Sequence, residues 1–292
     1  MEWIRELVSA EIIDLPLFLI VGSLSAVIVA MAKAGFGGSL GLLSVPLMVY
    51  ACGGDKARFG VGLMLPILIA CDYLALIAWL PQRRDWNWKV VRNLLPGTIV
   101  GIALGGTLIY LFQQMGGTAE AKADAETLAD NWLKLFIGAI AMLFVTLQLI
   151  KTIRKHPITF KPNFAAACGT GLAAGTCSTL AHAAGPITAM YLLPQRMTKE
   201  QYVPTTVLFY FIANQIKLVP YFALSLVTKE SLMTGLVLLP AVPIGVVLGK
   251  LLAKRISQRV FMTIVYTLLG LAGVHLCYGA TKTLHAIWMG GS

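Results

Sequence analysis

Apolar runs of about 20 residues recur from end to end of this chain, and they constrain its fold more than any other feature. As a helix, a run of that length crosses a hydrocarbon core of about 30 Å and satisfies its own backbone hydrogen bonds where water is absent. Of the 292 residues, 58% are hydrophobic and only 12% are charged, about half the charged share of an ordinary soluble domain. The sequence therefore predicts an all-α, polytopic membrane protein.

Short polar loops separate the apolar segments and orient them. The expected segments are 16–33, 39–51, 60–80, 94–113, 132–151, 163–177, 179–194, 203–226, 232–250 and 260–280. Loops 81–93, 151–162 and 250–259 each carry four basic residues, whereas loop 114–131 carries four acidic residues and one lysine. Because basic loops stay on the cytoplasmic side, we expect these three loops inside and loop 114–131 outside.

The same charge bias predicts that two parts of the chain are hairpins. The span 60–80 runs from outside to inside, so segment 16–51 must begin and end outside. The span 203–226 runs from inside to outside, so segment 163–194 must begin and end inside. We therefore expect two helical hairpins that enter from opposite faces, each followed by three ordinary spans, with both termini outside.

A short pattern occurs once in each hairpin. Residues 34–46 read AGFGGSLGLLSVP, and residues 174–186 read AGTCSTLAHAAGP. A second pair matches in register, because residues 94–105 read LLPGTIVGIALG and residues 238–249 read LLPAVPIGVVLG. The offsets of 140 and 144 residues are nearly equal. With the opposite orientations of the hairpins, they predict two inverted-topology repeats, 1–151 and 163–280, which are typical of secondary transporters.

These motifs carry a resemblance to a known family. AGFGGS at 34–39, AGTCSTLAHAAGP at 174–186 and TTVLFYFIANQIK at 205–217 resemble the TauE/SafE family of sulfite and organosulfur-anion exporters, over nearly the whole chain. The resemblance implies export of small sulfur-containing anions such as sulfite, sulfoacetate or related sulfonates. One departure is TCS at 176–178, where many members are richer in glycine. We expect a multi-pass protein of the plasma (inner) membrane of a bacterium.

The two Gly-rich interruptions have the chemistry of an anion site. A broken membrane helix exposes backbone N–H groups, and the start of the returning helix carries partial positive charge that an anion can satisfy. Gly37 and Gly38 belong to the first break. The returning helices are expected to begin near Ser39 and near Ser178 or Thr179, whose hydroxyls can cap a helix or donate to an oxyanion. The alternative is that the glycines only let helices pack closely.

Polar side chains inside the apolar segments extend this candidate site. A cation within the membrane indicates function by default, and Lys217 lies well inside the span 203–226. It could balance a bound anion or pair with Asp72, which the repeat offset places opposite Asn214. Lys33, just before the first break, could instead extend to the membrane interface. The substrate-binding candidates outside the breaks are Lys217, Asn214, Gln215 and Lys33.

His182 is the candidate for proton coupling. It lies one turn beyond Thr179, and histidine titrates in the physiological range, although a hydrogen-bonded structural role is the alternative. The sequence contains no nucleotide-binding motif, so we expect coupling to the proton gradient, or to substrate and membrane potential, rather than to ATP. No cofactor or metal is expected, because the five cysteines form no CxxC pair.

We therefore expect a secondary transporter that exports these anions by alternating access. A passive small-anion channel, which would use the same helix ends without coupling, is the alternative. An enzyme is not expected, because Cys177 and His182 have no evident carboxylate partner. The expected partners are a small anionic substrate and the lipid bilayer, with a homo-oligomer left open. Nucleic acid is not expected, because the net charge of +10 comes from separate basic loops.

Overall fold

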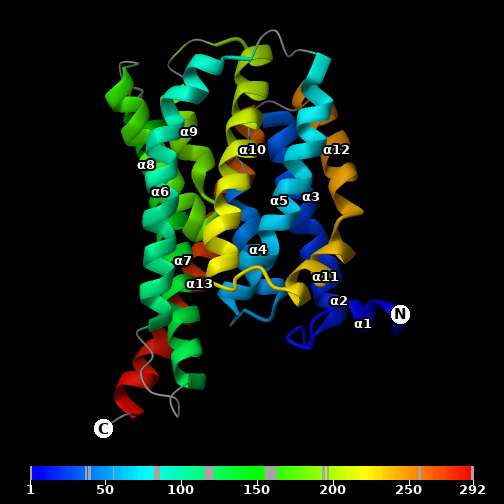
Figure 1. Ribbon diagram of the computed structural model, residues 1–292, viewed down its shortest axis with the longest axis vertical. Coiled ribbons are helices and arrows are strands. Elements are labelled where there is room, and N and C mark those ends of the chain that lie inside the picture. The colour runs from blue at the N-terminus through cyan, green and yellow to red at the C-terminus, as the bar shows by residue number, and fades with distance from the viewer. Residues whose placement is uncertain are drawn as a thin grey trace.

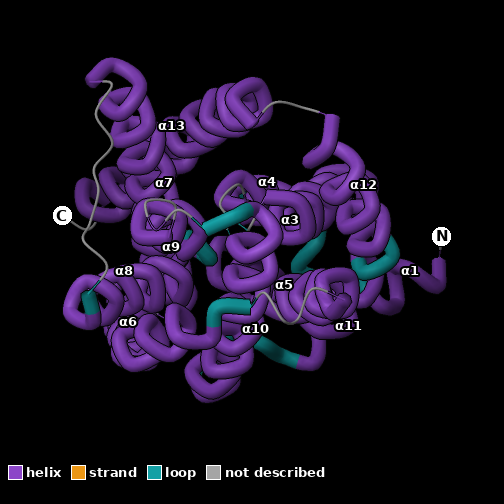
Figure 2. The backbone as a smooth tube through the Cα atoms, turned by 90° about the horizontal axis from the view of Figure 1, so that it is seen from above, coloured by secondary structure: helices purple, strands orange, loops and turns teal. Residues whose placement is uncertain are grey.

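The computed structural model describes residues 2–36, 38, 41–54, 56–81, 86–114, 122–154, 163–192, 195, 197–255 and 258–290. Throughout these residues the protein is a bundle of helices without a strand (Figures 1 and 2). Five of the described helices are long and apolar enough to cross a membrane, and a bent helix pair brings the number to six. The predicted all-α, polytopic membrane fold is confirmed.

The helices follow the predicted segments closely. They are α1 (Glu2–Leu7), α2 (Leu15–Leu17), α3 (Ser23–Phe36), α4 (Ser44–Ala51), α5 (Ala57–Trp79), α6 (Trp88–Gln114), α7 (Lys122–Arg154), α8 (Phe164–Ala181), α9 (Ala184–Leu192), α10 (Lys199–Ala223), α11 (Lys229–Leu238), α12 (Ala241–Arg255) and α13 (Gln258–Gly290). A π-helical turn joins α2 to α3, and a 3₁₀ turn at Gly41–Leu43 precedes α4.

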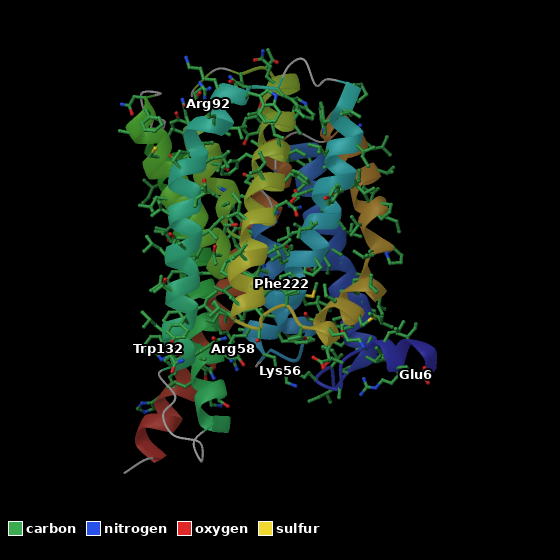
Figure 3. The ribbon with its side chains drawn as sticks, in the orientation of Figure 1. Glu6, Lys56, Arg58, Arg92, Trp132 and Phe222 are labelled. Atoms are coloured by element: carbon green, nitrogen blue, oxygen red, sulfur yellow. The ribbon has the colours of Figure 1, made fainter. Side chains whose placement is uncertain are left out.

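Both termini lie at the same end of the bundle, the lower end in Figure 1. Figure 3 places Arg58, in the first turn of α5, near Trp132 of α7 at that lower end. Arg92, near the start of α6, lies at the opposite end (Figure 3). The start of α6 and the ends of the described chain are thus at opposite ends of the bundle, as the charge bias predicts. Which end faces outside stays a prediction.

Each predicted hairpin consists of a long helix and a shorter one that follows it after a break. α3 ends at Phe36, and α4 begins at Ser44, five residues after its predicted start near Ser39. The second break lies later than predicted, between the end of α8 at Ala181 and the start of α9 at Ala184. Ser178 and Thr179 therefore do not start the returning helix; they belong to the last turn of α8.

Local backbone chemistry explains the position of the second break. The Thr179 hydroxyl donates to the carbonyl oxygen of Gly175 at 2.9 Å, which satisfies a hydroxyl within a helix instead of making it a cap. His182 ends α8 in the left-handed region, with φ 49° and ψ 30°. Pro186 then falls in the first turn of α9, where a proline is tolerated because its missing N–H has no helical partner.

The expected span 232–250 is also not one straight helix. α11 and α12 are bent by 51° at a short break between them. Pro240 lies in this break, and because it lacks an N–H donor it interrupts the helical hydrogen bonds there. In the matching segment, Pro96 lies inside α6 without ending it. One matched proline thus divides a span while the other does not.

Each hairpin packs against a helix of the other half of the chain. α8 lies along α6 and α3 lies along α12, while α7 pairs with α13 and α5 with α10. A Cβ atom added to Gly175 would meet the carbonyl oxygen of Thr98 at 2.4 Å, and one added to Gly35 would meet that of Gly249 at 2.2 Å. The matched glycines of the repeated motif therefore serve close helix packing. This exchange of partners supports the inverted repeats, which stay a prediction.

Candidate functional site

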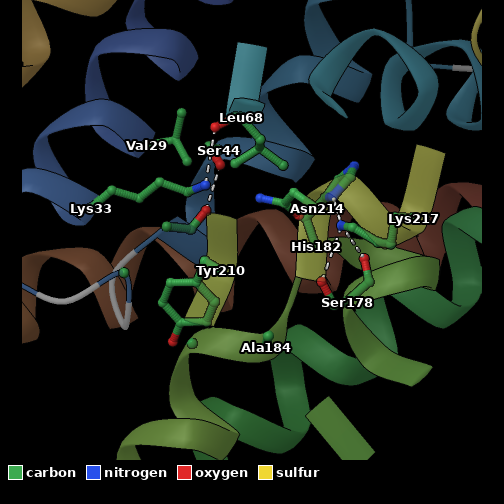
Figure 4. A pocket seen from close by; sticks show the side chains of 13 residues that line it. Val29, Lys33, Ser44, Leu68, Ser178, His182, Ala184, Tyr210, Asn214 and Lys217 are labelled. Atoms are coloured by element: carbon green, nitrogen blue, oxygen red, sulfur yellow. Dashed lines mark hydrogen bonds between the residues drawn. The ribbon is translucent and has the colours of Figure 1, made fainter. Parts of the chain in front are cut away.

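The tips of the two hairpins meet at one small cavity inside the bundle (Figure 4). Its volume is about 30 Å³, which is roughly the share of one water molecule in the liquid. Residues of both hairpins, α5 and α10 line it: Val29, Lys33, Gly38, Gly41, Ser44, Leu68, Ser178, His182, Ala184, Gly185, Tyr210, Asn214 and Lys217. Ser44 and Ala184 are the first residues of α4 and α9, so both returning helices begin at the cavity.

Lys217 on α10 is fully buried at one side of this cavity. Its Nζ lies 2.8 Å from Nδ1 of His182, 3.1 Å from Oγ of Ser178 and 3.2 Å from the Ser178 carbonyl oxygen (Figure 4). It also lies 5.8 Å from the centre of the Tyr221 ring. Across the described part of the chain no carboxylate forms an ion pair with it. The alternative of a Lys217–Asp72 pair is therefore wrong.

Asp72 on α5 is paired with the other intramembrane lysine. Its Oδ1 lies 2.5 Å from Nζ of Lys33, and its Oδ2 accepts a hydrogen bond of 2.6 Å from Nδ2 of Asn214. Lys33 also donates to the carbonyl oxygen of Leu68 at 3.2 Å. Because the exposed fractions of Lys33 and Asp72 are 5% and 0%, Lys33 does not extend to the membrane interface. The contact of Asp72 with Asn214 joins the two positions that the repeat offset matches.

The hydrogen bonds of His182 assign its tautomer. Nε2 lies 2.9 Å from the carbonyl oxygen of Val61, and Nδ1 lies 2.8 Å from Nζ of Lys217. A carbonyl oxygen can only accept, so Nε2 carries a proton and donates. Since an ammonium can only donate, Nδ1 accepts from Lys217, and His182 is then a neutral imidazole. Both ring nitrogens are engaged, as expected for the structural alternative.

The first break contributes backbone as well as side chains to the cavity. Gly38 lines it with a left-handed φ of +73°, and a Cβ at this position would come within 2.5 Å of the Tyr210 ring. Only glycine combines that backbone geometry with the close approach. Gly37 and Ser39, the other candidates from this break, lie outside the described residues.

Two predicted residues are not part of the cavity lining. Thr179 is fully buried, and its hydroxyl bonds within α8. Gln215 lies on α10 next to Asn214 but does not face the cavity. The remaining candidates, namely Lys33, Gly38, Ser178, His182, Asn214 and Lys217, are brought together there. Their roles in binding stay predictions.

Among the lining residues with polar side chains, sequence reasoning missed Tyr210 and Ser44. Tyr210, Asn214 and Lys217 follow the i, i+4, i+7 spacing of one helix face, so this periodicity could have found the tyrosine. The tyrosine hydroxyl shares a hydrogen bond with Thr188 of α9. Ser44 gave no comparable signal, because its place depends on where the first break ends.

A polytopic helical bundle in which two broken helices meet at a buried, lysine-lined cavity is the architecture of a membrane transporter. A family model described as sulfite exporter TauE/SafE matches residues 23–276, which are most of the chain. The protein therefore belongs to the TauE/SafE sulfite exporter family. Comparison with curated proteins gives no match, and comparison with solved structures gives none either.

Ser178 and Thr179 are adjacent hydroxyl residues with different surroundings, and they give a matched test of the cavity. We expect Ser178→Ala to weaken anion binding about fivefold, because the hydroxyl that holds the Lys217 ammonium is lost and such a hydrogen bond is worth about 1 kcal/mol. Thr179→Val should leave binding unchanged, because its hydroxyl only bonds within α8. The measurement is the sulfonate concentration that half-saturates flux into proteoliposomes. An equal loss in both variants would contradict the assignment of the cavity.

Proposed function

We propose that this protein exports small sulfur-containing anions, such as sulfite, sulfoacetate or related organosulfonates, across the plasma membrane of a bacterium by alternating access. One observation carries the proposal: Lys217, a buried cation without a carboxylate partner among the described residues, lies where both hairpin breaks meet. Membership in a family of sulfite exporters supports the chemical class of the substrate.

The surroundings of the cavity suit an oxyanion. The first residues of α4 and α9 line it, and the start of a helix carries partial positive charge from unpaired N–H groups. Lys217 adds a full positive charge at the same place. A sulfite or sulfonate group has three oxygens and can accept from the ammonium and from backbone N–H groups together. Because the site excludes bulk water, these contacts are stronger than they would be at a surface.

The size of the cavity and the placement of the hairpins support alternating access. A volume of about 30 Å³ holds roughly one water, so a sulfur oxyanion must widen it to bind. The two hairpins approach the cavity from opposite ends of the bundle. We propose that movement of α3–α4 opens the cavity toward one membrane face and movement of α8–α9 opens it toward the other.

Flux measurements in proteoliposomes test this proposal. Purified protein should release loaded sulfite or an alkanesulfonate faster than protein-free liposomes do, with saturation at high concentration. Absence of stimulated flux by intact protein would contradict export of these anions. Failure of a pH gradient to drive uphill accumulation, with flux present, would instead favour the passive channel.

We propose that the proton coupling resides in the contact between Lys217 and His182. The two facing nitrogens lie 2.8 Å apart and share one proton, so the pair carries a single positive charge whichever nitrogen holds it. Loss of that proton would leave a neutral pair with weak affinity for an anion. A pair that binds the proton with the anion, and loses it afterwards, carries both in the same direction, so the pH on each side of the membrane affects the anion flux.

Replacement of His182 tests this coupling. We expect His182→Asn to flatten the dependence of flux on pH, because Lys217 then loses the partner with which it shares the proton. Asparagine is the suitable replacement because it tolerates the left-handed backbone at this position, with φ 49°. The pH profile of sulfonate flux is compared with that of the unmodified protein, and an unchanged profile would reject the coupling role of His182.

A further inference from the structure

Few charged side chains of the described residues lie at the cavity. Within the described residues, the charged side chains at its wall are Lys33 and Lys217, and Asp72 lies directly behind Lys33 and Asn214. From the returning helices, Ser44, Ala184 and Gly185 contribute no charge. The other residues of the first break are Gly37, Ser39 and Leu40, and none of them is an ionisable residue. The balance of charge at the site is therefore decided by two lysines and one aspartate, with His182 sharing the proton of Lys217.

Asp72 neutralises Lys33. Their charged atoms are 2.5 Å apart, and both side chains are removed from water. Inside a protein an ion pair of this kind is held strongly, because breaking it leaves an uncompensated buried charge. Asn214 donates to the second carboxylate oxygen at 2.6 Å, so both oxygens of Asp72 are engaged by fixed donors. Lys33 and Asp72 thus act as one neutral unit.

Within the described residues, the groups in contact with Lys217 are all neutral. Its ammonium contacts the carbonyl and hydroxyl oxygens of Ser178, the imidazole of His182 and the ring of Tyr221. None of these carries negative charge. An ammonium without a counter-ion is costly in an interior from which water is excluded, and a bound anion removes that cost.

We propose that the loaded cavity is electrically balanced by an anion of charge −1. Among the anions of the proposed function, the protein then selects monovalent ones, such as alkanesulfonates and hydrogensulfite, and transports divalent ones, sulfoacetate included, only poorly. Asp72 is the positioning residue that sets this selectivity, because it cancels the charge of Lys33. A divalent anion would leave one negative charge uncompensated beside the Asp72 carboxylate. This inference rests on the proposed function, since it requires that the anion binds in this cavity.

Two sulfonates that differ mainly in charge give the first test, which needs no variant. Isethionate and sulfoacetate share a two-carbon chain and a sulfonate group, but isethionate ends in a hydroxyl and sulfoacetate in a carboxylate. We expect the unmodified protein in proteoliposomes at neutral pH to prefer isethionate on the order of a hundredfold in kcat/KM, since like charges side by side are strongly disfavoured. Equal rates, or a preference for sulfoacetate, would overturn the inference.

A set of Asp72 variants gives the second test. Asp72→Asn keeps the shape of the side chain but leaves Lys33 uncompensated, so the loaded site should favour a charge of −2. We expect the ratio of isethionate to sulfoacetate kcat/KM to fall by at least about tenfold. Asp72→Glu, which keeps the carboxylate, should retain the original preference for isethionate. A purely structural role of Asp72 would lower both rates and leave the ratio unchanged, which would contradict the inference.

The double variant Asp72→Asn with Lys33→Met provides the decisive comparison. It removes both charges of the neutral unit, so the anion-free site again carries one positive charge and the preference for isethionate should return. Failure of this return would overturn the inference even if Asp72→Asn alone does not fold. A different result would contradict the proposed function itself, namely that the unmodified protein transports neither sulfonate. If it transports both equally, only the charge selectivity is wrong.

Discussion

Lys217→Met is expected to reduce sulfonate flux on the order of a thousandfold while the protein remains folded. The ammonium is the positive charge in the cavity that has no carboxylate partner among the described residues, and the neutral thioether cannot replace it. Loss of one partner from a buried charged contact costs about 3–5 kcal/mol, and each 1.4 kcal/mol corresponds to about a factor of ten. Methionine keeps the length of the apolar stem, so the tight packing around this buried side chain is preserved.

The matched control for this prediction is another lysine on the same bundle. Lys250 on α12 donates to the carbonyl oxygen of Ala78 at 2.7 Å and lies 5.5 Å from the centre of the Trp79 ring, away from the cavity lining. Lys250→Met removes the same charge from the protein and should leave flux nearly unchanged. Flux is measured in proteoliposomes with equal amounts of monodisperse protein. Normal flux in Lys217→Met would remove Lys217 from the site.

The architecture could be predicted from the sequence because membrane helices obey strong local rules. Length and hydropathy predicted the segments, and loop charge predicted opposite hairpins. The place of the second break could not be derived in the same way. Ser178 and Thr179 are favoured caps as well as tolerated helix residues, and the sequence does not say which hydrogen bond a hydroxyl will make. The left-handed turn at His182 ends α8, and the returning helix begins at Ala184, five residues after Thr179.

The composition of the site was partly predictable for a related reason. Charged and amide side chains are too costly within the membrane to occur by chance, so Lys33, Asn214 and Lys217 were recognisable without a structure. The sequence did not show which of the two lysines pairs with Asp72. Either lysine could have reached Asp72, and the choice depends on how α3 and α10 approach α5 in three dimensions. The pairing leaves Lys217, and not Lys33, without a carboxylate partner among the described residues.

The matched glycines of the repeated motif have a role of their own, and Gly175→Ala should reveal it. An added methyl group would meet the carbonyl oxygen of Thr98 at 2.4 Å and the amide nitrogen of Ile102 at 3.0 Å. Backbone atoms of α6 cannot rotate away as a side chain could, so α8 must move off α6 along their shared face. Overpacking of this kind lowers the free energy of unfolding by up to about 3 kcal/mol. We expect a clearly lower temperature of unfolding in detergent and, because α8 carries Ser178, reduced flux in the protein that remains folded.

Gly169 on the same helix is the control, because a Cβ at that position meets nothing within 4 Å. Gly169→Ala makes the same chemical change two turns away and should leave the unfolding temperature unchanged or raise it, since alanine favours helix more than glycine does. The two variants separate loss of packing from a general effect of replacing glycine in α8. Equal stability of both variants would argue against close α6–α8 packing. A large loss of flux in Gly175→Ala at normal stability would point instead to a direct part of this glycine in the anion path.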